Sequence, residues 1–128
     1  MEEYEEDIDE IAKEKLLKKL IIKIGKIKAS RFKHSQDSYS TDTRYSTNVG
    51  RFRLVLREHQ AEGDYNTNYY YYLTVYNGKR IIAKYEGFGI DEGLGRLYCD
   101  IEEACRQRSK DARNKSIKDL TCLLKRDP

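Results

Sequence analysis

The dipeptide Asn77-Gly78 is the feature that most constrains the fold of this chain. It lies between two runs that are rich in β-forming residues, YYYYLTVY at 69–76 and KRIIAKYE at 79–86. Asn-Gly favours the positive backbone angles of tight hairpin turns, and it is the strongest short-range hairpin signal. The preceding run RFRLVLREH, residues 51–59, alternates apolar and charged side chains, as a half-buried strand does. These runs predict a three-stranded antiparallel β-meander.

The hairpin turn also predicts which side chains share a face of the sheet. If Asn77 and Gly78 form a two-residue turn, Tyr76 pairs with Lys79, and one face then carries Arg80, Lys84 and Glu86. Burying unpaired charges costs several kcal/mol, so this face is expected to point outward. The opposite face is expected to form the core. Its residues are Phe52, Leu54 and Leu56 from the first strand, and Tyr70, Tyr72, Tyr76, Ile81, Ala83 and Tyr85 from the hairpin.

Helical patterns flank the predicted sheet. Apolar residues recur at helical spacing over residues 4–24, and Gly25 lies where a helix end is expected. After the sheet, one apolar stripe runs from Leu94 to Cys105, and a second, shifted stripe runs from Ile117 to Leu124. No proline or glycine interrupts residues 96–127, which predicts either one long bent helix or two helices. The expected fold class is α+β.

The chain is 128 residues long, and this length fits a single domain, residues 1–128. We expect an acidic and lysine-rich N-terminal helix within residues 1–28, and the sheet with its C-terminal helices over residues 51–128. The segment 29–50 is rich in Ser, Thr, Asp and Asn, so a long, flexible loop is expected there. Loops of this length are uncommon in compact domains, and a tolerated surface loop and a second contact site are both consistent with it.

The modest net charge of +3 conceals a strong asymmetry along the chain. Residues 1–10 hold seven acidic residues and no basic ones, whereas residues 11–34 have a net charge of +8. Such a pattern suits a solvated helix whose charges follow the helix dipole. The other interpretation is a basic stripe for nucleic acid that the acidic segment partly screens.

Composition and motifs narrow the class of protein. The acidic start lacks the apolar core of a secretory signal, and no apolar run is long enough for a membrane span, so a cytoplasmic protein without membrane contact is expected. Three cysteines and two histidines show no metal-ligand spacing, and no nucleophile or nucleotide-loop motif fits its context. We therefore expect neither an enzyme nor a cofactor or metal site.

The first functional hypothesis is an interaction module that binds a protein partner, or another copy of itself, through the outward face of the sheet. Arginines and tyrosines around an apolar strip are typical of binding hot spots. A helix that covers this face is the alternative. The predicted partner-binding residues are Arg51, Arg53, Arg57, Tyr69, Tyr71, Leu73, Arg80, Ile82 and Lys84.

The second hypothesis is nucleic-acid binding, to RNA or single strands. Besides the arginines and tyrosines of the sheet, it depends on the segment Ser109-Lys110-Asp111-Ala112-Arg113. This segment resembles, with one base fewer, the Lys-Lys-x-Ala-Lys run of the double-stranded-RNA-binding domain, whose order of helix, three strands and helix is also similar. The resemblance implies phosphate contacts by Lys110 and Arg113.

Overall fold

The computed structural model describes residues 2–36, 42–63 and 65–126, with side chains from Glu10 onward. The element order is α1 (Glu2–Gly25), a 3₁₀ turn η1 (Ala29–Arg31), β1 (Lys33–Gln36), β2 (Asp42–Val49), β3 (Phe52–Glu62), β4 (Thr67–Asn77), β5 (Arg80–Phe88) and α2 (Gly93–Arg126). The α+β class is confirmed. The helix expected over residues 4–24 and the helical C-terminal segment are both present, and the latter is one uninterrupted helix.

The sheet is an antiparallel meander with five strands in the order β1-β2-β3-β4-β5, so the predicted count of three was wrong. The two additional strands lie in the segment that was expected to be a flexible loop. Val49 pairs with Phe52 across a two-residue turn, whose Gly50 has a φ of +59°. The polar composition of β2 hid an alternation in which Tyr45 and Thr47 are buried and point toward the helices. Pairing with β3 therefore decided the structure of this segment.

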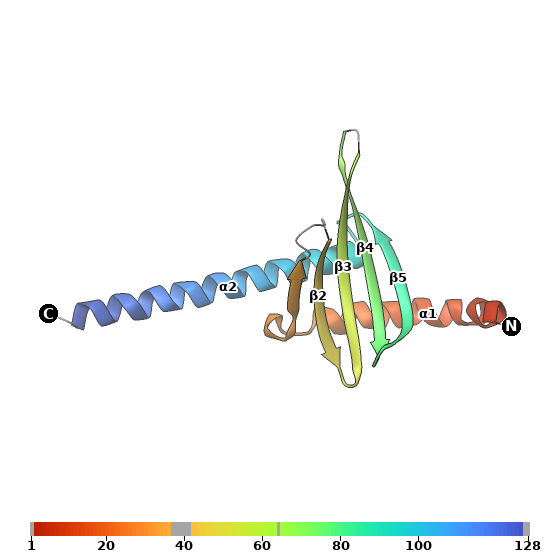
Figure 1. Cartoon of the computed structure of the whole chain (residues 1–128), viewed down its shortest axis with the longest axis horizontal. Coiled ribbons are helices and arrows are strands. Elements are labelled where there is room, and N and C mark those ends of the chain that lie inside the picture. The colour runs from red at the N-terminus through yellow and green to blue at the C-terminus, as the bar shows by residue number, and fades with distance from the viewer. Residues whose placement is uncertain (1, 37–41, 64, 127–128) are drawn as a thin grey trace.

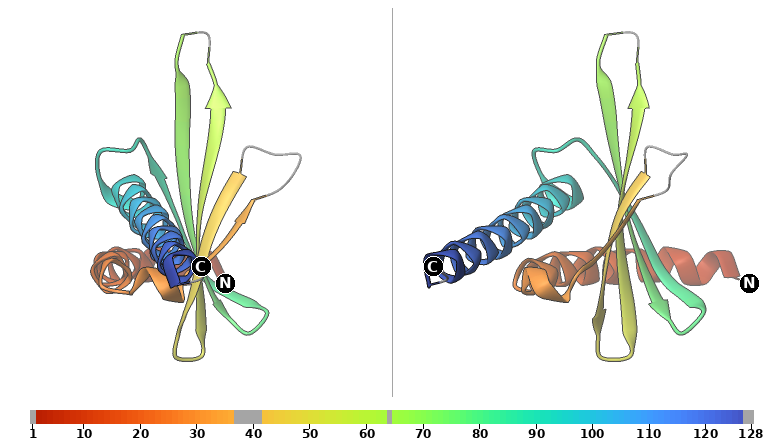
Figure 2. Two further views of the ribbon diagram at one scale, coloured as in Figure 1. Left: turned by 90° about the vertical axis from the view of Figure 1, so that its left-hand side faces the viewer. Right: turned by 60° about the vertical axis from the view of Figure 1, so that its left-hand side comes forward.

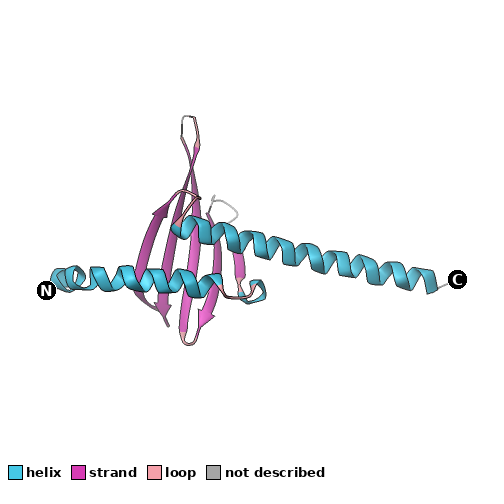
Figure 3. Ribbon diagram, turned by 180° about the vertical axis from the view of Figure 1, so that it is seen from behind, coloured by secondary structure: helices cyan, strands magenta, loops and turns pink. Residues whose placement is uncertain are grey.

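Both helices pack on one face of the sheet and leave the other face open (Figures 1 and 3). The core lies between the helices and this inner face. Ile24 from α1 and Leu97 from α2 meet the sheet residues Leu56 and Leu73, all of them buried. Figure 2 shows the sheet edge-on, with the helices on one side of it only. The predicted core stripe of α2, from Leu94 to Cys105, is confirmed.

The predicted pairing of β4 with β5 was wrong, and the error exchanged the faces of β4. The two turn residues are Gly78 and Lys79, so Asn77 pairs with Arg80. A bulge between Val75 and Tyr76 then shifts the pairing further, and Val75 lies opposite Ala83. The displaced turn moves the pairing by two residues and so keeps the same side chains on one face, whereas the bulge leaves one extra residue in β5 and exchanges the faces of β4 relative to β5.

The consequence is that Tyr71, Leu73 and Val75 are core residues, whereas Tyr70, Tyr72 and Tyr76 lie on the open face. Ile81, predicted to be buried, is 47% exposed. The charged residues Arg80, Lys84 and Glu86 are exposed as expected, and Ala83, Leu54 and Leu56 are buried as expected. The rule about burying charge was therefore sound, but it was applied to the wrong strand pairing.

Candidate binding surface

The outer face of the sheet is the face that neither helix covers (Figure 2). Its centre is β4, where Tyr70, Tyr72, Thr74 and Tyr76 alternate with the core residues of the same strand. Alternation in an extended strand sends successive side chains to opposite faces. Because the inward positions of β4 are apolar or tyrosine, the consecutive tyrosines can serve the core and the surface at the same time.

Arginines of β3 stack against these tyrosines. The guanidinium carbon of Arg57 lies 4.5 Å from the ring centroid of Tyr72, its partner across the strands. Arg53 and Tyr76 form an equivalent pair at 4.7 Å. Cation–π pairs of this kind contribute about 0.5–1 kcal/mol at exposed sites and hold both side chains in position. We call Arg53, Arg57, Tyr72 and Tyr76 the Tyr–Arg ladder.

Asp42 orders one end of the ladder. Its two carboxylate oxygens contact Arg57, at 3.3 Å, and Nδ1 of His59, at 2.5 Å. The Asp42 side chain is only 15% exposed, whereas those of Arg57 and His59 are about 40% exposed. Arg57 is thus held by a ring on one side and by a carboxylate on the other. Its position is fixed before any ligand arrives, which reduces the entropy lost on binding.

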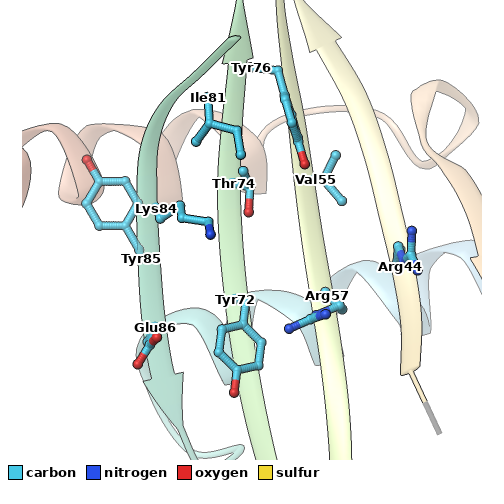
Figure 4. Close-up of a pocket in the computed structure, with 10 residues that line it drawn as sticks. All are labelled: Arg44, Val55, Arg57, Tyr72, Thr74, Tyr76, Ile81, Lys84, Tyr85 and Glu86. Carbon is cyan, nitrogen blue, oxygen red and sulfur yellow. The ribbon is translucent and has the colours of Figure 1, made fainter. Parts of the chain in front are cut away.

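The outer face is hollowed between β2 and β5, with a volume of about 420 Å³. Val55, Thr74 and Ile81 contribute less polar side chains to the hollow, and charged and aromatic side chains surround them (Figure 4). The remaining lining residues are Arg44, Arg57, Tyr72, Tyr76, Lys84, Tyr85 and Glu86. This combination of an apolar centre and a polar rim resembles the anatomy of protein interfaces.

The predicted partner-binding residues do not form one surface. Tyr71 and Leu73 are 0% exposed and belong to the core, so the prediction that they contact a partner was wrong. Tyr69 is partly buried and packs against the same core. The physical reason is the shifted pairing of β4, which directs all three toward the helices.

The remaining predicted residues are accessible. Arg53, Arg57 and Lys84 lie on the outer face, and Arg57 and Lys84 line the hollow. Arg80 and Ile82 are exposed near the β4–β5 turn, and the exposed Arg51 lies over the ring of Phe52.

The sequence-based assignment missed Arg44, Tyr72 and Tyr76 as surface residues. A signal for the tyrosines was present, since the inward residues Leu73 and Val75 are more apolar than their neighbours Tyr72 and Thr74. Arg44 lay in the segment that was expected to be a loop, so no strand pairing was available to place it.

Lys110 and Arg113 lie in α2, well away from the outer face of the sheet. Instead of opening a final helix, they occupy the middle of a single helix that begins at Gly93. The sheet also has two more strands than the predicted order of helix, three strands and helix. The feature that suggested phosphate contacts by analogy, a basic run at a helix start, is therefore not found here.

Among the residues whose side chains the structure describes, one acidic side chain is buried on the inner face. Glu58, 7% exposed, accepts a hydrogen bond from the Tyr71 hydroxyl at 2.8 Å and another from Gln60 at 3.0 Å. Nearby, Thr43 and Tyr98 share a hydrogen bond. These partners satisfy polar groups inside the core, which is the usual role of such bonds.

Burial also changes the acidity of the inner-face groups. Desolvation, reinforced by the negative charge of Glu102, raises the pKa of Tyr45 to about 12. Burial likewise raises the pKa of the Cys99 and Cys105 thiols. A thiol with a raised pKa is a weaker nucleophile at neutral pH.

Two further observations concern sites of other kinds. Within residues 2–36, 42–63 and 65–126, no group of three or more metal-binding side chains comes together. In the same ranges, neither α1 nor α2 contains an apolar window that would suit a membrane span.

Comparisons of the chain with protein-family models, with curated proteins and with solved structures find no match.

Proposed function

We propose that this protein is a non-enzymatic interaction module that holds a protein partner on the outer face of its sheet. The observation that carries the proposal is the Tyr–Arg ladder on a face that neither helix covers. Tyrosine and arginine are enriched in the residues that dominate binding energy at protein interfaces. A surface of this composition, already held in position, is suited to binding.

The geometry favours a protein over a nucleic acid. One face of each ladder ring is occupied by a guanidinium, which leaves less ring surface on which a base could stack. The rings still offer their edges and hydroxyls, and the hollow beside them offers Val55 and Ile81. Protein side chains use such mixed contacts well.

The charges on the outer face indicate the chemistry of the partner. Arg53 and Lys84 are exposed on either side of the ladder tyrosines. The partner segment would place an apolar side chain in the hollow and carboxylates near these two cations. Charge complementarity of this kind increases association rates and excludes wrong partners.

The test is partner capture with wild-type protein and with Arg53→Glu/Tyr72→Ala. Arg108→Glu/Leu123→Ala is the matched control, because both residues are exposed on α2 and the variant makes the same types of change away from the sheet. We expect the ladder variant to lose the captured partner while the control keeps it. Circular dichroism should show that both variants remain folded. Equal capture by all three proteins would remove the sheet face as the binding site.

The second candidate function is single-stranded nucleic-acid binding. The observation that favours it is the row of Tyr70, Tyr72 and Tyr76 along one strand, with cations on both sides. Fluorescence anisotropy with labelled RNA and DNA single strands at low and high salt tests this function. Binding that weakens steeply with salt, and that is lost in Arg53→Glu/Tyr72→Ala, would replace the protein-partner proposal.

A further inference from the structure

The C-terminal part of α2 extends beyond the body of the protein. The helix contacts the core as far as Cys105, whose thiol lies near the carbonyl of Ala29. Every residue from 106 to 126 is exposed. This segment of 21 residues projects for about 30 Å at the rise of an α-helix, and Figure 1 shows it leaving the sheet on the side opposite the N-terminus.

A single projecting helix gains little stability from its surroundings. Most helical stability in proteins comes from packing of an apolar face rather than from intrinsic propensity. Here the apolar side chains are present without a partner among the described residues: Ile117, Leu120, Leu123 and Leu124 are between 56% and 65% exposed. Such exposed apolar side chains on a helix indicate a docking surface.

One face of the projecting segment has the spacing of a helix–helix seam. Lys110, Arg113, Ile117, Leu120 and Leu124 follow one another at intervals of three and four residues. Lys110 and Arg113 therefore lie on the same face of the helix as the three apolar side chains, nearer to the body of the protein. A partner that fits this face must supply apolar contacts at one end and negative charge along the rest.

The charge of the projecting segment points to an acidic partner. Residues 106–126 contain eight basic and two acidic residues, a net charge of +6. Two such segments would repel each other, so pairing of α2 with α2 from a second copy is disfavoured.

The same chain contains a shorter helical segment of opposite charge. Residues 2–10 form the start of α1 and carry all seven acidic residues of the first ten. The hydroxyl of Tyr85, on the edge strand β5, bonds the carbonyl of Lys13, and the helix before this point extends past the sheet (Figure 1). Ile11 in this part is 67% exposed, so an apolar contact is available there too.

The two segments are unable to meet within one molecule, because they project past opposite edges of the sheet (Figures 1 and 3). We propose that the projecting part of α2 in one copy docks the acidic N-terminal part of α1 in a second copy. Two such contacts related by a two-fold axis close a dimer. The seam from Lys110 to Leu124 is about 20 Å long, and residues 2–10 of α1 span about 13 Å, enough to cover the larger part of it.

An anionic polymer or membrane is a poorer occupant of this face. The acidic segment of the same chain, with its net charge of −7, lowers the net charge of the protein to +3 and so weakens the long-range attraction of either one. In a dimer, the acidic segment of the second copy supplies the negative charge that complements the projecting part of α2. Self-association of this kind is separate from partner binding on the sheet, since it uses neither the ladder nor the hollow.

Sedimentation equilibrium at low and high salt tests the dimer. The full-length protein should dimerise at low ionic strength and dissociate as salt screens the charges, since the Debye length is about 10 Å at 0.1 M salt and about 3 Å at 1 M. Lys110→Glu/Arg113→Glu should weaken dimerisation by about tenfold or more. The matched control Lys115→Glu/Arg126→Glu makes the same change of charge on the opposite side of α2 and should have a smaller effect.

A charge exchange makes the test specific. A protein with Glu5→Lys/Glu6→Lys should pair with the Lys110→Glu/Arg113→Glu protein more tightly than either variant pairs with itself. Leu120→Ala/Leu124→Ala should also weaken the dimer, whereas Arg53→Glu/Tyr72→Ala should leave it unchanged. A monomer at low salt and high concentration would overturn the proposal. So would a dimer that is insensitive to the Lys110/Arg113 and Leu120/Leu124 changes, or one that only the sheet variant disrupts.

Discussion

Tyr71 and Tyr72 are adjacent in the sequence and chemically identical, yet the structure predicts opposite effects when each loses its hydroxyl. Tyr71 is fully buried and donates a hydrogen bond to Glu58 at 2.8 Å. Tyr72 lies on the open face with its ring against Arg57. The substitutions Tyr71→Phe and Tyr72→Phe remove the same atom from the two faces of one strand.

The magnitude follows from the bond that Tyr71→Phe removes. A hydrogen bond to a charged acceptor contributes about 1.5–3 kcal/mol, and a buried carboxylate that loses a donor has no water to replace it. Glu58 keeps the bond from Gln60 to its other oxygen, so we expect a loss of about 2 kcal/mol. For a chain of this length the corresponding decrease in Tm is about 6–8 °C. Tyr72→Phe should change stability by less than about 0.5 kcal/mol.

Urea denaturation followed by circular dichroism measures both effects. A double-mutant cycle with Glu58→Gln then isolates the Tyr71–Glu58 interaction, and a coupling energy of at least about 1 kcal/mol is expected. Equal losses for Tyr71→Phe and Tyr72→Phe would refute the assignment of faces along β4. A coupling energy near zero would refute the argument that the hydrogen bond stabilises the core.

Three further substitutions or conditions probe the core. The buried Thr47 hydroxyl has no hydrogen-bond partner among the described residues, so Thr47→Val should raise the free energy of unfolding by about 1 kcal/mol in urea denaturation. A Cβ at Gly95 would lie 1.8 Å from the Gly89 carbonyl oxygen, so Gly95→Ala should lower the free energy of unfolding by about 3 kcal/mol or more. A Cβ at Gly25 meets only a side chain, at 3.9 Å, so Gly25→Ala should be nearly neutral. Thermal unfolding of the two variants measures the difference. Because the pKa of Tyr45 is raised to about 12 from an unfolded value of 10.0, the unfolded chain loses its proton first. The free energy of unfolding should therefore fall by about 3 kcal/mol as the pH rises from 10 to 12, whereas Tyr45 should not affect it below pH 10. Denaturation at increasing alkaline pH, with Tyr45→Phe as the control, tests this.

Local patterns were sufficient to predict most of the elements. The helical spacing of Leu17, Leu20 and Ile24 predicted the part of α1 that packs on the core, and the stripe from Leu94 to Cys105 predicted the buried half of α2. Alternation in β3 predicted that Leu54 and Leu56 are buried. Each of these signals depends on residues close in sequence, whose relative positions are set by the geometry of a helix or strand.

The composition of β2 was misleading because its polar residues are also common in loops. Arg44, Ser46 and Asn48 alternate with the inward side chains of Tyr45 and Thr47. This segment is a strand because it pairs with β3. The hydrogen bonds and packing of that pairing cannot be predicted from the propensities of nearby residues. Because Arg44 lines the hollow, the candidate surface could not be assembled without that pairing.

Composition and period were enough to predict an antiparallel meander between helices, although with three strands instead of five, and the exposure of Arg53 and Lys84. Tertiary structure decided which tyrosines form the core and which form the surface. The physical reason is that the side-chain period of a strand is two, so the single bulge between Val75 and Tyr76 reverses the faces of β4 relative to β5 without changing any local signal. Only packing against α1 and α2 distinguishes the two arrangements, because it buries Tyr71, Leu73 and Val75 and leaves Tyr72 and Tyr76 beside the arginines.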